Sequence, residues 1–261
     1  MNQNQFKMQI EGIKLGRCKY GWMIYDGPYI GKCLELYGEY SESEVSVFKS
    51  CIKQGDVAIE IGANIGSLTL PISQLVGPEG RVIAVESHPE TFNILCANLA
   101  INGLKNVKPI NSFVANSNDV ETSSPVWGKY AFVSEIWETQ YLKLDDILLP
   151  RLDFMKVDVD GNELAVLKSG VRHIEKYKPI IYFENDLKDR SPDLLQWIMA
   201  LGYRVFFHLA PIFLGNNFYE NPENAWAPKV IHSLMMLAVP DGNPIPIGLR
   251  EVESPNDWWQ D

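Results

Sequence analysis

Apolar residues recur along the chain in short runs that alternate with longer segments of helical periodicity. From residue 56 onward these runs are rich in β-branched and aromatic residues, as in the strands of a parallel sheet that is covered on both faces. The candidate strands are Val57–Ile61, Val82–Glu86, Val107–Asn111, Phe154–Val159, Ile180–Glu184, Tyr203–Phe207 and Leu234–Val239. This pattern predicts an α/β fold in which one sheet lies between two layers of helices.

Two of the connecting segments have clear helix boundaries. The sequence Ser87-His88-Pro89-Glu90 supplies an N-cap and places a proline at the first helical position. Apolar residues from Phe92 to Leu99 then recur at helical spacing, and Gly103 ends the pattern where a left-handed residue is favoured. The sequence Ser191-Pro192-Asp193 predicts the start of another helix in the same way.

The two ends of the chain have a different pattern. Residues 1–55 contain closely spaced glycines and an amphipathic helix near Ser43–Ile52, so we expect an N-terminal cap of hairpins on the same domain. We expect residues 56–240 to form the main domain. Residues 241–261 are rich in proline and acidic residues, which predicts an extended tail that Trp258 and Trp259 could dock.

Charge and cysteine content exclude several classes of protein. The chain has 23 Lys and Arg against 33 Asp and Glu, and its net charge of -10 disfavours nucleic acid and anionic membranes as partners. Apolar runs such as Leu234–Val239 are far shorter than the about 20 residues that span a bilayer. The polar start and four cysteines without a CxxC pair favour a cytoplasmic protein with reduced thiols.

The segment after the first strand predicts a cofactor site. Val57–Ile61 runs into Gly62-Ala63-Asn64-Ile65-Gly66 and then into the helical segment Ser67–Val76. A strand, a glycine loop and a helix in this order direct backbone N–H groups toward an anionic part of a cofactor. Glu86 ends the second strand 20 residues after Gly66, where a carboxylate can accept two ribose hydroxyls. The sequence therefore predicts a cofactor that contains ribose.

The spacing of the loop distinguishes two cofactor classes. NAD requires G-x-G-x-x-G, but Ala63 and Asn64 stand where its middle glycine would be. S-adenosylmethionine has no pyrophosphate to seat, and Glu60 favours its cationic methionyl group. We therefore favour S-adenosylmethionine, and an NAD-dependent oxidoreductase is the alternative.

Taken together, the motifs resemble those of the FkbM-type methyltransferases, a family within the class I S-adenosylmethionine-dependent enzymes. The resemblance covers roughly residues 36–185. Its motifs are Tyr37-Gly38-Glu39, Glu42, Glu44, Gln54-Gly55-Asp56, Ile61 to Gly66, Glu86, Leu144-Asp145-Asp146 and Lys156 to Glu163. The family more often has aspartate in place of Glu60 and Glu-Gly in place of Asp160-Gly161.

The resemblance implies a Rossmann-like sheet of seven strands, the last of them antiparallel, with the cofactor across the carboxyl ends of the first, second and fourth. The implied cofactor contacts comprise Glu60, Gly62, Asn64 and Gly66 around the methionyl part, Glu86 and Ser87 at the ribose, Ser112 and Phe113 at the adenine, and Asp158. Phe113 could equally well be an aromatic residue of the hydrophobic core.

Three strand ends converge beyond the cofactor and supply candidate catalytic residues. His208 could take a proton from an acceptor hydroxyl, or it could bond to backbone at a strand end. Asp158 and Glu184 with Asn185 are similar to the Mg²⁺ ligands of metal-dependent O-methyltransferases. Alternatively, these acidic residues cap a helix or contact the cofactor's amino group.

The connection between the last two strands is long for a compact domain. Its Phe218, Tyr219 and Trp226 offer flat faces for a sugar-like acceptor, so we expect an acceptor-binding lid, with packing as the alternative. We therefore expect S-adenosylmethionine-dependent O-methylation of a hydroxyl on a saccharide or a small-molecule natural product. A further alternative is a non-catalytic protein that binds S-adenosylmethionine and contacts a partner through the tail that contains Trp258 and Trp259. The sequence gives no signal for the oligomeric state.

Overall fold

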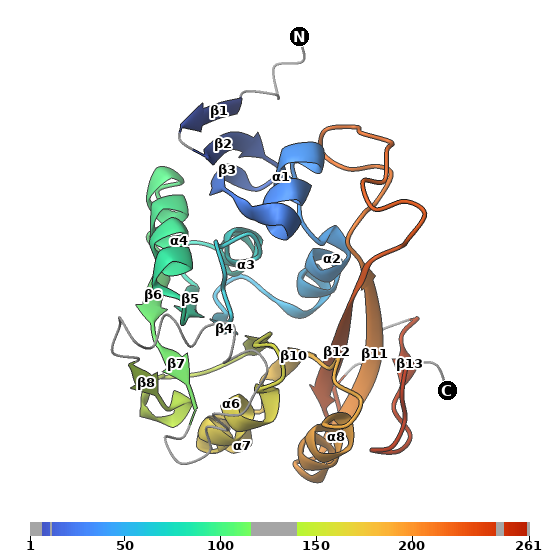
Figure 1. Cartoon of the computed structure of the whole chain (residues 1–261). Coiled ribbons are helices and arrows are strands. Elements are labelled where there is room, and N and C mark those ends of the chain that lie inside the picture. Colours follow the sequence, from blue (N-terminus) through green and yellow to red (C-terminus); the bar gives the residue numbers. More distant parts are fainter. Residues whose placement is uncertain (1–6, 11, 116–139, 244–247, 260–261) are drawn as a thin grey trace.

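The computed structural model describes residues 7–10, 12–115, 140–243 and 248–259 (Figure 1). Parts of the expected cap and tail, residues 1–6 and 244–247, lie outside this range. The large sheet has eight described strands in the order β13-β11-β12-β10-β9-β4-β5-β6. Their bounds are β4 Val57–Ile61, β5 Arg81–Glu86, β6 Val107–Asn111, β9 Phe154–Val157, β10 Ile180–Glu184, β11 Tyr203–Pro211, β12 His232–Pro240 and β13 Arg250–Glu251.

The topology confirms the predicted α/β fold. The strands β6, β5, β4, β9 and β10 pair in parallel, and β12 runs antiparallel to both β10 and β11. All seven predicted strands are present. The eighth, β13, comes from the segment expected as a tail and pairs with β11 at the edge of the sheet.

Helices cover both faces of the sheet because the strands are apolar on both sides; all five residues of β4 are buried. On one face, Ile59 and its neighbours pack against α6 (Glu163–Ser169), α7 (Val171–Tyr177) and α8 (Ser191–Ala200). On the other, Ala58 and its neighbours pack against α2 (Glu42–Cys51) and α3 (Thr69–Val76). The helix α4 (Pro89–Ile101) lies beside α3 in Figure 1. Along β4, therefore, Ile59 faces one helical layer and Ala58 the other.

The N-terminal segment packs on α4. It forms a three-stranded antiparallel sheet of β1 (Lys7–Ile10), β2 (Ile13–Cys18) and β3 (Gly21–Tyr25), followed by a helical turn η1 (Gly27–Gly31) and α1 (Lys32–Tyr37). The side chain of Asn98 accepts a hydrogen bond from the backbone N of Ile24 at 2.6 Å and donates one to its carbonyl at 2.9 Å. Asn102 bonds Trp22 in the same way. Two amides of α4 thus pair with β3 as a neighbouring strand would.

Small elements connect the main ones. The two-residue strands β7 (Phe113–Val114) and β8 (Tyr141–Leu142) pair in parallel, and η2 (Leu144–Asp146) follows them. At the C-terminal end, Trp259 donates its indole N–H to the carbonyl of Asn185 at 2.9 Å and packs on Phe207. No helix among the described residues is long and apolar enough to span a bilayer.

Candidate active site

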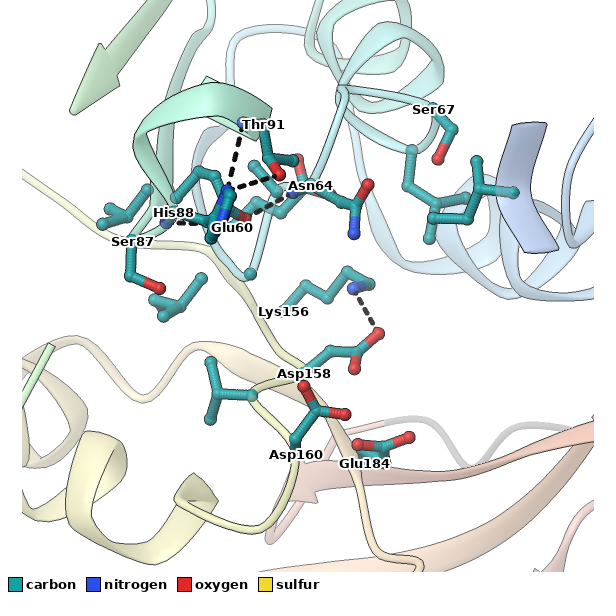
Figure 2. Close-up of a pocket in the computed structure, with 18 of the residues that line it drawn as sticks. Glu60, Asn64, Ser67, Ser87, His88, Thr91, Lys156, Asp158, Asp160 and Glu184 are labelled. Carbon is teal, nitrogen blue, oxygen red and sulfur yellow. Dashed lines mark hydrogen bonds and ion pairs between the residues drawn. The ribbon is translucent and has the colours of Figure 1, made fainter. Parts of the chain in front are cut away.

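A cavity of about 1020 Å³ opens at the carboxyl edge of the parallel strands (Figure 2). The ends of β4, β5, β9 and β10 form its floor, and the start of β12 forms one side. The opposite wall comes from the N-terminal segment, through Asp26 to Ile30 in and before η1 and through Tyr40. The cavity is therefore closed by residues that lie far from the strand ends in the sequence.

The loop after β4 has the close backbone approach that its glycines predict. Gly62 has φ +80°, and a Cβ placed on it would lie 1.8 Å from the carbonyl oxygen of Asp158. Asn64 also has a positive φ, of +50°. Gly62 and Asn64 line the cavity. Gly66, which was also expected around the cofactor, does not: its φ is +88° and a Cβ on it would contact Leu95. Its role is to turn the chain into α3.

Glu86 lies beside this loop and joins it to the next helix. Its carboxylate accepts hydrogen bonds from the backbone N of Asn64 at 2.9 Å and of His88 at 2.8 Å. Burial raises the pKa of Glu86, and these N–H donors oppose that rise. Each carboxylate oxygen keeps a lone pair, so the group can still accept hydroxyl donors from the cavity. Ser87, Ser112 and Phe113, which the family resemblance assigns to the ribose and the adenine, line the same cavity.

Glu60 presents a buried carboxylate oxygen without a partner. Its side chain is 1% exposed and lines the cavity. One oxygen accepts a hydrogen bond from the Thr69 hydroxyl at 2.6 Å, and no described group bonds the other. Burial raises the pKa of Glu60 to about 7. A buried carboxylate in this state is stabilised by a cationic donor, so the site fits the ammonium group of S-adenosylmethionine.

Lys156 is a functional candidate whose role is not evident from the sequence motifs. It is 2% exposed, lies directly opposite Glu60 across the β4–β9 pair, and forms a 2.9 Å ion pair with Asp158. Burial lowers its pKa, but the charges of Asp158, Glu60 and Glu44 outweigh burial and raise it. The signal in the sequence was a lysine inside the buried strand Phe154–Val157.

Carboxylates gather at the other end of the cavity, around Asp158. Figure 2 shows Asp158, Asp160 and Glu184 on one side, with Glu60 and His88 across from them. Burial raises the pKa of Glu184 well above its usual range, and the charges of Asp158 and Asp186 raise it further. One oxygen of Glu184 is buried and has no partner among the described residues. These surroundings favour the protonated form of Glu184 over the carboxylate.

The expected Mg²⁺ set does not assemble. Successive residues of a strand point to opposite faces, so Glu184 and Asn185 diverge. Asn185 is 3% exposed, does not line the cavity and donates to the Ser191 hydroxyl at 2.9 Å. Asp158 already pairs with the ammonium of Lys156. No group of three histidine, cysteine or acidic residues within the described ranges has the geometry of a metal site. The donor set does not fit Mg²⁺.

His208 lies away from the cavity, contrary to the expectation that it acts as the base. The strand β11 extends past it to Pro211, so His208 sits inside the strand rather than at its end. Its ring nitrogens contact the Tyr182 hydroxyl at 2.7 Å and the Ser43 hydroxyl at 3.1 Å. Burial lowers the pKa of His208 to about 4. His208 therefore links β10 to α2 through hydrogen bonds and has a structural role.

The expected lid residues also lie outside the cavity wall. Tyr219 is 8% exposed, and its hydroxyl donates to the carbonyl of Arg17 at 2.8 Å. The backbone N of Phe218 donates to the Glu39 carboxylate at 3.0 Å. Trp226 does not line the cavity, and its ring lies 6.1 Å, between centroids, from that of Tyr29, which does. The segment therefore packs on the N-terminal cap, where Tyr219 is buried and the Trp226 ring lies against Tyr37.

Glu44 and Glu60 give the stability of the protein a pH dependence. Burial raises the pKa of each to about 7 from 4.5, so between these values the folded chain holds protons that the unfolded chain releases. Their contribution to the free energy of unfolding is expected to fall as the pH rises from 4.5 to 7. Urea unfolding across this range should show a flatter pH dependence in Glu44→Gln than in wild type. Glu90→Gln, at an exposed position, is the control, and an unchanged slope in Glu44→Gln would contradict the assignment.

Known proteins resemble this chain in sequence and in fold. The tRNA(Phe) (4-demethylwyosine(37)-C(7)) aminocarboxypropyltransferase of Methanocaldococcus jannaschii is 25% identical over 173 residues, which cover 59% of this chain and 66% of that protein. The match thus spans slightly less than two thirds of that relative.

Solved structures share the fold at low identity. The precorrin-6y C5,15-methyltransferase of Geobacter metallireducens has 18% identity and a TM-score of 0.50, over 76% of this chain and 88% of that one. An S-adenosylmethionine-dependent O-methyltransferase of Thermotoga maritima has 12% identity and a TM-score of 0.50, over 93% and 88%. A model of the methyltransferase FkbM domain matches residues 60–205, which include the glycine loop, Glu86 and the ends of β9 and β10. Because this match covers more than half of the chain, the protein belongs to the FkbM family of methyltransferases.

Proposed function

We propose that the protein transfers the methyl group of S-adenosylmethionine to a hydroxyl of a small molecule or saccharide. The proposal is supported by one observation: a single cavity has one end suited to the cofactor and another end open to an acceptor. The glycine loop, the unpaired oxygen of Glu60 and the carboxylate of Glu86 lie at the cofactor end. Tyr40 and the start of β12 lie at the other end, where an acceptor would bind.

The chain's own residues would bind and orient the two reactants. Glu60 would accept hydrogen bonds from the ammonium group, and Glu86 from the ribose hydroxyls. Bound there, the cofactor supplies an electrophilic methyl group on a sulfonium. Asp158, fixed by Lys156, would contribute negative charge beside that sulfonium. Most of the rate enhancement would then come from orientation and from a preorganised electrostatic field.

The acceptor is inferred to be neutral or cationic. Among the described residues that line the cavity, Lys156 is the single lysine or arginine. Its ammonium already forms an ion pair with Asp158. An anionic acceptor would have no cation to pair with, and the net charge of -10 adds long-range repulsion. The relative from Methanocaldococcus jannaschii is named as a tRNA-modifying enzyme, but these charges disfavour RNA as an acceptor here. We also propose a cytoplasmic location, which the four free thiols support.

The test is transfer of an isotopically labelled methyl group. The protein would be incubated with methyl-labelled S-adenosylmethionine and fractionated host metabolites and glycans, and products identified by mass spectrometry. We expect label in an O-methyl group of a neutral or cationic compound. The Glu60→Gln variant keeps the side-chain shape and should need more cofactor for the same yield. Cofactor binding without transfer to any fraction would favour a non-catalytic role, and label on nitrogen or carbon would overturn the hydroxyl assignment.

A further inference from the structure

His232 differs from the other histidines of the chain in its surroundings. The sequence has four histidines. His173, on α7, contacts the carbonyl oxygen of Ile147 through its Nε2 at 2.9 Å. Both ring nitrogens of His208 form hydrogen bonds, with the hydroxyls of Ser43 and Tyr182. His88 lines the cavity, but its Nδ1 caps α4 near Thr91. His232 lines the cavity, and no described residue forms a hydrogen bond with its ring.

The position of His232 places it at the acceptor end. It is the first residue of β12, whose Leu234 carbonyl accepts a hydrogen bond from the backbone N of Asn185 at 2.8 Å. The start of β12 therefore lies beside the end of β10. From β9, which bears Asp158, to β12 is two strand spacings, or about 10 Å. An acceptor hydroxyl between the cofactor and His232 fits this span.

Two of the carboxylates at this end, Asp158 and Glu184, are poorly suited to the same task. Asp158 is tied to Lys156 by an ion pair at 2.9 Å. Glu184 is buried among other acidic groups, and burial with the charges of Asp158 and Asp186 raises its pKa, which favours its protonated form. Ile212 and Leu234 line the cavity near the start of β12. The imidazole of His232, which lines the cavity and has no hydrogen bond to a described residue, offers ring nitrogens that can accept a proton here.

We propose that His232 is the general base of the reaction, an inference that rests on the proposed methyl transfer to a hydroxyl. As the acceptor oxygen forms a bond to the methyl carbon, the carbon–sulfur bond breaks and its electron pair stays on sulfur. An unprotonated ring nitrogen of His232 takes the hydroxyl proton and later releases it to solvent. The products are the methyl ether and S-adenosylhomocysteine, so atoms and charge balance.

The test compares three variants of the full chain: His232→Gln, His232→Ala and, as the matched control outside the cavity, His173→Gln. Calorimetry with S-adenosylhomocysteine should give the same Kd for wild type and both His232 variants. Transfer of labelled methyl to the acceptor fraction that wild type modifies should fall about 100-fold or more in kcat for His232→Gln, with little change in KM. Added imidazole should restore part of the activity of His232→Ala and should not affect His232→Gln.

The outcomes separate this inference from the proposed function. Label transfer by wild type with equal kcat in His232→Gln would overturn the role of His232 and leave the methyl transfer standing. A loss of kcat in His232→Ala that imidazole does not restore would also overturn it, because it would show a structural role. No transfer by wild type to any fraction would overturn the proposed function and this inference together.

Discussion

Replacing Lys156 by methionine is expected to lower the free energy of unfolding by about 3–5 kcal/mol at pH 7. The side chain is 2% exposed, and its ammonium is the positive charge that Asp158, Glu60 and Glu44 share. Methionine fills a similar volume but leaves these carboxylates without a counter-charge. Urea unfolding followed by fluorescence would measure the loss. The loss should shrink as the pH falls from 7 towards 4.5, because Glu44 and Glu60 then take up protons in the folded chain.

Lys49→Met is the matched control for this prediction. Lys49 forms a 2.8 Å ion pair with Glu42, but its side chain is 47% exposed. Exposed pairs of this kind contribute about 1 kcal/mol or less. Equal losses in the two variants would contradict the view that Lys156 holds the buried acidic groups together.

Replacing Gly62 by alanine is expected to lower the free energy of unfolding by about 2–5 kcal/mol. Two effects combine there: the left-handed φ of +80°, and a Cβ that would lie 1.8 Å from the carbonyl oxygen of Asp158. The end of β9 must move to accept the new methyl group. Binding of S-adenosylhomocysteine should weaken as well, because the loop and Asp158 shift together.

Gly55→Ala separates the two effects. Gly55 has φ +86°, but nothing lies within 4 Å of a Cβ placed on it. Alanine there should lose about 1–2 kcal/mol from backbone strain alone. If Gly62→Ala and Gly55→Ala lower the free energy of unfolding by the same amount, the close approach of the loop to the end of β9 does not contribute to stability.

Several residues that the sequence assigns to the cofactor line one cavity because they follow one another along strand ends. Glu60, Gly62, Asn64 and Glu86 all belong to β4, β5 or the loop after β4, and local pattern fixes such positions. The acceptor end depends on long-range packing. Tyr40 reaches the cavity from the N-terminal cap, and no local pattern could place it opposite β12.

The errors also have local physical causes. His208 was placed at a strand end because the apolar run stops at Phe207, whereas pairing with β12 continues to Pro211. Tyr219 was placed over the cavity because its segment starts near the cofactor crevice. Instead, contacts of its ring with Gly38, at the end of α1, hold it against the cap. Both differences come from contacts between residues far apart in the sequence.

The central claim is that this cavity binds S-adenosylmethionine, and calorimetry with its stable product S-adenosylhomocysteine tests it most directly. Wild type should bind one equivalent, should show no heat with NAD, and should bind at least about 10-fold more tightly than Glu60→Gln, because a charge-assisted hydrogen bond contributes about 1.5–3 kcal/mol. Binding of NAD instead, or an affinity for S-adenosylhomocysteine that Glu60→Gln leaves unchanged, would contradict the account.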